Sequence, residues 1–138
     1  MLYFFKQQDD FYLDFCNSNG AAPCIDAFVR SNQEYIKTRF DNIFDELKQK
    51  IKTENAKKFI QELNFELYKK IIGDSIKIYI ARAYITTIQE YGSLPGFTIY
   101  NMAKKIMEKA KEKQYIKVLE NAISNVDISL RKSFDIFN

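Results

Sequence analysis

The side chains that could carry chemistry in this 138-residue chain are carboxylates, lysines, tyrosines and two cysteines, because histidine is absent. Without imidazole the chain lacks the side chain that usually titrates near neutral pH, and neither a Ser-His-Asp nor a Cys-His arrangement can be built. The Glu-x-x-His pairs that hold two metal ions in helical bundles are excluded for the same reason. We therefore expect a protein that is not an enzyme, with no catalytic residue, no metal site and no cofactor.

Two remaining arrangements of chemical interest have ordinary explanations. Asp41 with Asp45 and Glu62 with Glu66 are carboxylate pairs spaced four apart, which is typical of solvated helix faces. The glycine-rich stretch 92–96 has no Lys-Ser/Thr after it and no strand before it, so it does not match a phosphate-binding loop.

The two cysteines bear on the compartment. Cys16 and Cys24 flank a Gly-Ala-Ala-Pro stretch and could meet as a disulfide across that turn. Two thiols in a chain with no export signal are more often reduced core residues, which is the interpretation we favour. The first ten residues do not resemble a secretory signal, and no run approaches the ~20 apolar residues of a membrane span. We expect a cytoplasmic protein.

Apolar residues recur three and four positions apart along almost the whole chain, which predicts helices. We expect helices at about 3–18, 23–52 (with a bend or a buried polar contact at Asn32) and 54–72, with Thr53 as the N-cap of the last and Gly73 as its end. Asp74 would cap the next helix, 75–91. The alternation at 76–80 also fits a strand, but no second strand is visible to pair with it.

The later part of the chain predicts a fifth helix capped by Thr98, a kink or a new helix near Glu112, and a short final helix at about 128–137. Segment 75–91 is apolar nearly all round, which is typical of a helix enclosed by others. The fold class is therefore all-α: a single domain, residues 1–138, forming a bundle of six or seven helices around 75–91.

The first expected helix has an unusually wide aromatic face beside acidic residues. Residues 1–36 contain two basic and five acidic side chains, whereas the rest of the chain is basic and brings the total to +3. Exposed aromatic rings rimmed by carboxylates are typical of a protein interface. The competing interpretation, that this wide face is wrapped into the core, is at least as strong. The candidate partner-binding residues are Phe4, Phe5, Asp9, Asp10, Phe11, Tyr12 and Asp14.

A lysine-rich segment, 104–117, gives the alternative. Six lysines face only two glutamates there, which is a weak electrostatic signal for nucleic acid. Arginine, the better bidentate reader of phosphate and guanine, is absent from the cluster, and a solvated helix face explains the lysines more simply. The residues of this alternative are Lys104, Lys105, Lys109, Lys111, Lys113 and Lys117.

These observations favour a non-enzymatic protein-binding module that blocks its partner by shape and charge. Isoleucine, lysine, phenylalanine, asparagine, tyrosine and methionine make up half of the chain, which indicates an AT-rich gene of bacterial or phage type. A small neutralising inhibitor or immunity-type protein, with a toxin or nuclease as partner, fits this description, since the cleft of a nuclease is basic. The alternative is a nucleic-acid-binding helical domain. No membrane partner is expected.

Overall fold

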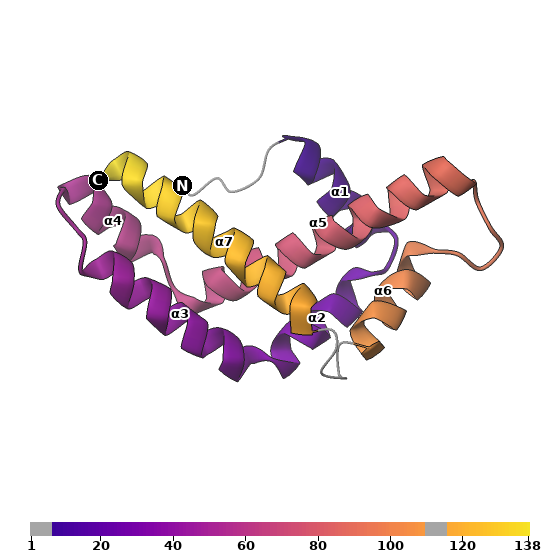
Figure 1. Cartoon of the computed structure of the whole chain (residues 1–138), viewed down its shortest axis with the longest axis horizontal. Helices are drawn as coiled ribbons and strands as arrows, with labels where there is room; N and C mark the ends of the chain where they lie inside the picture. Colours follow the sequence, from indigo (N-terminus) through magenta and orange to yellow (C-terminus); the bar gives the residue numbers. More distant parts are fainter. Residues whose placement is uncertain (1–6, 110–115) are drawn as a thin grey trace.

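The computed structural model describes residues 7–109 and 116–138, and this part of the chain forms seven helices and no strand (Figure 1). The all-α bundle expected from the sequence is confirmed. The helices are α1 (Gln7–Ser18), α2 (Ala22–Ser31), α3 (Gln33–Lys48), α4 (Glu54–Glu62), α5 (Phe65–Tyr91), α6 (Ile99–Lys109) and α7 (Ile116–Phe137).

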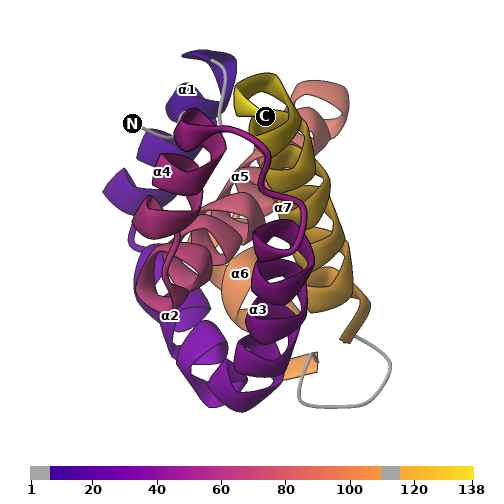
Figure 2. The ribbon, with the colours of Figure 1, turned by 90° about the vertical axis from the view of Figure 1, so that its left-hand side faces the viewer.

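The long helix α5 is the centre of the bundle, and it packs against α1, α2, α3, α6 and α7. Its buried residues lie between Tyr68 and Ala81, whereas the segment expected to be enclosed was 75–91, whose residues after Ala81 are half-buried or exposed. Residues 76–80 are helical, so the strand interpretation of their alternation is wrong. Helix α7 crosses α5 in the middle of the molecule (Figure 1), and α3 and α4 lie beside α7 (Figure 2).

The expected helix 23–52 is divided into α2 and α3 at Asn32. Asn32 leaves the helical conformation, and its side-chain amide donates to the Phe28 carbonyl at 2.9 Å. This amide competes with the backbone for that carbonyl, which is why asparagine favours a break. The sequence had singled out Asn32 as a position for a bend, and the bend there is a complete interruption.

The expected boundary at Gly73 and Asp74 is wrong, because α5 runs through both residues. The chain instead leaves the helix at Leu63 and Asn64, where the Asn64 side chain accepts the Leu67 backbone N–H at 2.9 Å as an N-cap. Gly73 is buried, and a Cβ added there would lie 3.7 Å from Val29 of α2, which is an ordinary van der Waals contact. This glycine is therefore neither a helix end nor a residue that the packing of α2 requires.

Two of the expected helix caps are confirmed, and one expected helix is not. Thr53 and Thr98 accept backbone N–H groups from Ala56 and Asn101, both at 3.1 Å. The separate final helix 128–137 is wrong, since those residues continue α7. The kink expected near Glu112 and the start of the helix expected from residue 3 lie outside the described residues.

The last turn of α7 is fastened to the α3–α4 loop. The side chain of Asn138 accepts the Lys52 N–H at 2.7 Å and donates to the Lys50 carbonyl at 3.0 Å. The Thr53 hydroxyl donates to the Phe137 carbonyl at 2.6 Å. These bonds satisfy loop and helix-end groups and close one end of the bundle.

Candidate functional site

Arg82 is one of the residues through which α1 packs on α5. Arg82 of α5 forms a salt bridge with Asp9, and its guanidinium lies 5.0 Å from the centre of the Tyr12 ring. Cys16, one turn further along α1, is fully buried in the core. Asp9 and Tyr12, two of the candidate partner-binding residues, are therefore occupied by a contact within the protein, and this contact positions the rest of α1.

An aromatic row continues from α1 onto α5 and the loop after it. Ring centres are 6.4 Å apart between Phe11 and Phe15, 6.0 Å between Phe15 and Tyr84, and 5.2 Å between Tyr84 and Phe97. The Tyr84 hydroxyl also donates to the Phe97 carbonyl at 3.0 Å. Phe11, at the α1 end of this row, is 59% exposed, whereas the other three rings are half-buried.

Tyr84 and Phe97 were missed as candidate residues in the sequence. They lie about 70 and 80 positions after the α1 rings, and no local spacing connects such distant residues. Their aromatic character and the loop at 92–96 were visible, but only the fold places them beside Phe15.

The acidic edge of α1 is formed by Asp10 and Asp14, which lie one turn apart. Asp14 is exposed and Asp10 is half-exposed. Within residues 7–109 and 116–138, neither has an ion-pair partner. Both carboxylates belong to the same helix as the exposed ring of Phe11. Phe4 and Phe5, the other two candidates, lie outside the described residues.

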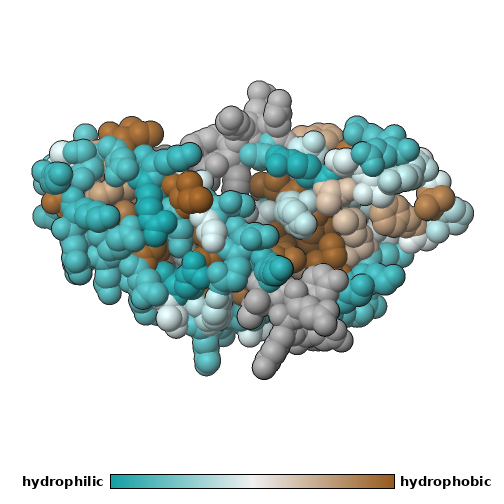
Figure 3. All heavy atoms as spheres, viewed as in Figure 1, coloured by the Kyte–Doolittle hydropathy of each residue, from teal (hydrophilic) through white to brown (hydrophobic). Residues whose placement is uncertain are grey.

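The candidate lysines are only partly brought together. Lys104, Lys105 and Lys109 are exposed on α6, and Lys117 is exposed near the start of α7. Lys111 and Lys113 lie outside the described residues. On the face drawn in Figure 3, mostly hydrophilic residues cover α3 and α7, whereas hydrophobic residues gather over the middle of α5.

A buried polar cluster joins α3, α5 and α7. The Tyr68 hydroxyl donates to Asp127 Oδ1 at 2.7 Å, and Arg39 Nη2 lies 3.8 Å from Asp127 Oδ2. Arg39 Nη1 also donates to both carboxylate oxygens of Glu120, at 3.0 and 2.8 Å. Asp127 is 5% exposed and Tyr68 is fully buried.

The pKa directions follow from this burial. Loss of solvent raises the pKa of Asp127, while the hydrogen bond from Tyr68 opposes the rise. Burial and the same bond raise the pKa of Tyr68, which keeps its hydroxyl protonated as the donor. Both groups are enclosed and bonded to each other, so the cluster joins helices and offers no open position for a substrate.

A second group of charges lies between α2 and α5. The buried Lys77 ammonium is 2.9 Å from Asp26 Oδ1 and 3.9 Å from Asp74 Oδ1. Lys70 pairs with the other oxygen of Asp74 at 3.2 Å. The free-energy cost of removing these charges from water is offset by the ion pairs that they form, so these residues also join α2 to α5.

The two cysteines are free thiols. Burial raises the pKa of Cys16 to about 11, and Cys24 Sγ donates to the Ala21 carbonyl at 3.1 Å. A buried thiol with a raised pKa holds little of the reactive thiolate at neutral pH.

All four paired carboxylates are exposed. Asp41 and Asp45 lie one turn apart on α3, as expected from their spacing, whereas Glu62 ends α4 and Glu66 belongs to α5, so the second pair does not share a helix. In the described part of the chain, no three acidic or cysteine side chains gather in a way that could hold a metal ion.

None of the helices that the structure describes combines the length and apolar character needed to cross a membrane. Comparisons with models of protein families, with curated proteins and with solved structures found no match to this chain.

Proposed function

We propose that this protein is a non-enzymatic binding module that captures another protein through the outer edge of α1. The observation that carries the proposal is the position of Phe11. Its ring is 59% exposed at the end of the aromatic row, and the carboxylates of Asp10 and Asp14 lie beside it. An aromatic ring surrounded by polar groups is the arrangement found at the energetic centres of protein interfaces.

The rigidity of α1 supports this proposal. The Arg82 contacts with Asp9 and Tyr12, together with the buried Cys16, fix the helix before any partner arrives. A surface that is already ordered loses less conformational entropy on binding than a mobile one. Asp9 and Tyr12 are not themselves free to bind a partner, but their contacts with Arg82 lower the entropy that the exposed part of α1 would lose on binding.

The acidic edge selects the kind of partner. Asp10 and Asp14 favour a basic surface with an apolar recess for Phe11. The cleft of a nuclease is basic because it holds phosphates, and covering that cleft would block the enzyme without any chemistry. We accordingly propose an inhibitor or immunity-type protein of the cytoplasm, encoded by an AT-rich bacterial or phage locus.

Site-specific photo-crosslinking in cells of the native host tests this proposal. A photoreactive phenylalanine analogue replaces Phe11 in one variant and Tyr91 in a control variant, because Tyr91 is 74% exposed at the far end of α5. We expect one discrete, competable protein adduct at position 11 and none at position 91. Equal labelling at both positions, or no adduct at either, would contradict the proposal.

A second candidate function has its own observation. Lys104 and Lys105 on α6 and Lys117 on α7 are exposed and have no ion pair among the described residues. Nucleic acid bound through them should dissociate steeply as salt rises, because each phosphate contact releases counterions. A filter-binding assay at low salt tests it, and absence of retention of both DNA and RNA would exclude this function.

A further inference from the structure

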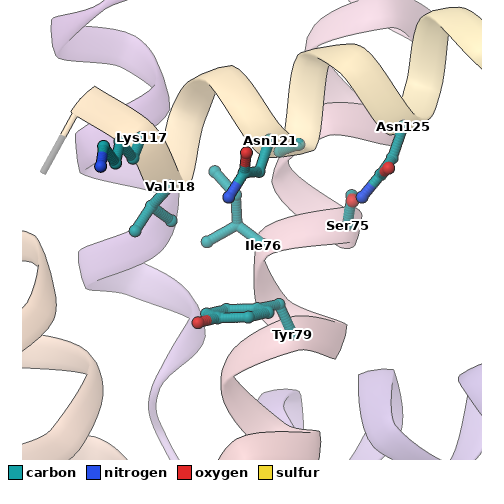
Figure 4. Close-up of a pocket in the computed structure, with 8 residues that line it drawn as sticks. Ser75, Ile76, Tyr79, Lys117, Val118, Asn121 and Asn125 are labelled. Atoms are coloured by element: carbon teal, nitrogen blue, oxygen red, sulfur yellow. The ribbon is translucent and has the colours of Figure 1, made fainter.

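A pocket of about 300 Å³ opens between α5 and α7 where the two helices diverge after crossing. Ser75, Ile76 and Tyr79 contribute to it from α5, and α7 contributes the residues from Lys117 to Asn125 that face them (Figure 4). This volume is at the lower end of the range of small-molecule sites, roughly 300–1,000 Å³. No residue of α1 lines the pocket, so it is separate from the proposed protein-binding edge.

The floor of the pocket is apolar and one of its walls is a flat ring. Ile76 and Ala122 are buried beneath it, and Val118 is half-buried. In Figure 4 the Tyr79 ring lies across one side, with Ile76 and Val118 on the other side of the open space. Tyr79 is 58% exposed, so its ring is accessible to a ligand. A space between an aromatic ring and branched aliphatic side chains suits a flat ring that can stack.

The polar groups around this space are not used by the protein. Asn121 and Asn125 are exposed, and Figure 4 shows the Asn121 amide pointing into the open space. None of the polar side chains that line the pocket has a hydrogen-bond or ion-pair partner within residues 7–109 and 116–138. An asparagine amide presents a donor and an acceptor side by side, which matches the edge of a nucleobase.

The charge at the rim of the pocket is also suited to a nucleotide. Among the described residues that line the pocket, Lys117 is the only ionised one, and none of them is a carboxylate. Its ammonium, on a flexible stem, suits a phosphate outside the stacked ring.

We propose that this pocket binds a nucleotide, with its base stacked on Tyr79, the edge of the base at Asn121 and its phosphate near Lys117. This chemistry is common to a free nucleotide and to one residue of a single-stranded nucleic acid. The inference does not depend on the proposed protein partner.

Isothermal titration of the full chain with adenosine monophosphate and with ribose 5-phosphate provides the test. Ribose 5-phosphate carries the same anion without a base, so we expect adenosine monophosphate to bind and ribose 5-phosphate to bind much more weakly. Tyr79→Ala should weaken binding of adenosine monophosphate roughly 5- to 150-fold, as loss of base stacking does. Tyr79→Phe should keep most of the affinity, and Tyr91→Ala, which removes an exposed tyrosine outside the pocket, should keep all of it.

A short single-stranded oligoadenylate distinguishes the two sources. Tighter, salt-sensitive binding of the oligonucleotide that still depends on Tyr79 supports a nucleic-acid strand, whereas no gain over the mononucleotide supports a free nucleotide.

Three results would overturn the inference: no binding of adenosine monophosphate or the oligonucleotide, equal binding of ribose 5-phosphate, or binding that Tyr79→Ala leaves unchanged. Oligonucleotide binding lost in a Lys104→Gln, Lys105→Gln variant but kept in Tyr79→Ala would assign recognition to the lysine surface instead.

Discussion

Replacement of Tyr68 by phenylalanine should destabilise the protein by deleting one buried hydroxyl. That hydroxyl donates to Asp127 Oδ1 at 2.7 Å, and Asp127 is 5% exposed. Arg39 lies 3.8 Å from the other oxygen, which is too distant for a hydrogen bond that would replace the lost one. A hydrogen bond to a charged group contributes about 1.5–3 kcal/mol to the free energy of unfolding. We expect Tyr68→Phe to lose about this amount at pH 7.

The loss should depend on pH in a defined direction. The bond from Tyr68 favours the ionised form of Asp127, so its removal raises the pKa of this carboxyl further above its unfolded value. As pH falls through the raised pKa, Asp127 becomes neutral in the variant, and the difference from wild type should shrink. It should approach the value of a neutral bond, about 0.5–1.5 kcal/mol. Comparison with wild type at each pH cancels the titration of the other carboxylates.

Urea unfolding followed by circular dichroism at neutral and acidic pH measures both effects. With the usual slope of about 1–3 kcal/mol per molar urea, the midpoint should fall by about 1 M at pH 7. In an Asp127→Asn background, the cost of Tyr68→Phe should be small and nearly independent of pH. Tyr91→Phe, at an exposed position, should change stability by less than about 0.5 kcal/mol. A loss below about 0.5 kcal/mol at pH 7, or an equal loss at both pH values, would refute this reasoning.

Three further predictions concern particular residues. Gly73→Ala should raise the free energy of unfolding, measured in urea, by about 0.5–1 kcal/mol, because alanine is more stable than glycine within a helix. The added Cβ would lie 3.7 Å from Val29, which is an ordinary contact. A loss of stability would show that α2 cannot accept the methyl group. Asn64→Ala should lower the free energy of unfolding by about 0.5–2 kcal/mol through loss of the α5 N-cap, whereas Asn55→Ala, at an exposed site within α4, should not. The Cys16 thiol, with its pKa raised to about 11 by burial, should react with a thiol reagent at neutral pH only after unfolding, and rapid labelling of folded protein would contradict its burial.

The helical content of the chain could be predicted because its apolar spacing is regular over long segments. The helical conformation of 75–91 and the caps at Thr53 and Thr98 follow from local signals, and they are confirmed, whereas the expected enclosure of 75–91 holds only as far as Ala81. The boundary at Gly73 was wrong because glycine is tolerated inside a helix that tertiary contacts stabilise, and the elements that α5 packs against come from distant parts of the chain. Asparagine is a favoured N-cap, so Asn64 could have been predicted to begin a helix, but Gly73 was taken as the boundary instead.

The contacts of the candidate site depended on residues too far apart to predict. Arg82 pairs with Asp9 across 73 positions, and Tyr68 meets Asp127 across 59. No spacing rule connects such residues, so the sequence could indicate an aromatic, acidic α1 but not which of its side chains remain free. The pocket at Tyr79 was equally unreadable, because its two walls come from separate helices.

The most direct test of the proposed binding function uses the partner protein that is captured at position 11. Its dissociation constant is measured for the complexes with wild type, Phe11→Ala and Tyr91→Ala. If Phe11 is the anchor of the interface, its truncation should raise the constant about tenfold or more, which is about 1.4 kcal/mol, while Tyr91→Ala matches wild type. Equal constants for all three proteins would show that α1 does not carry the binding.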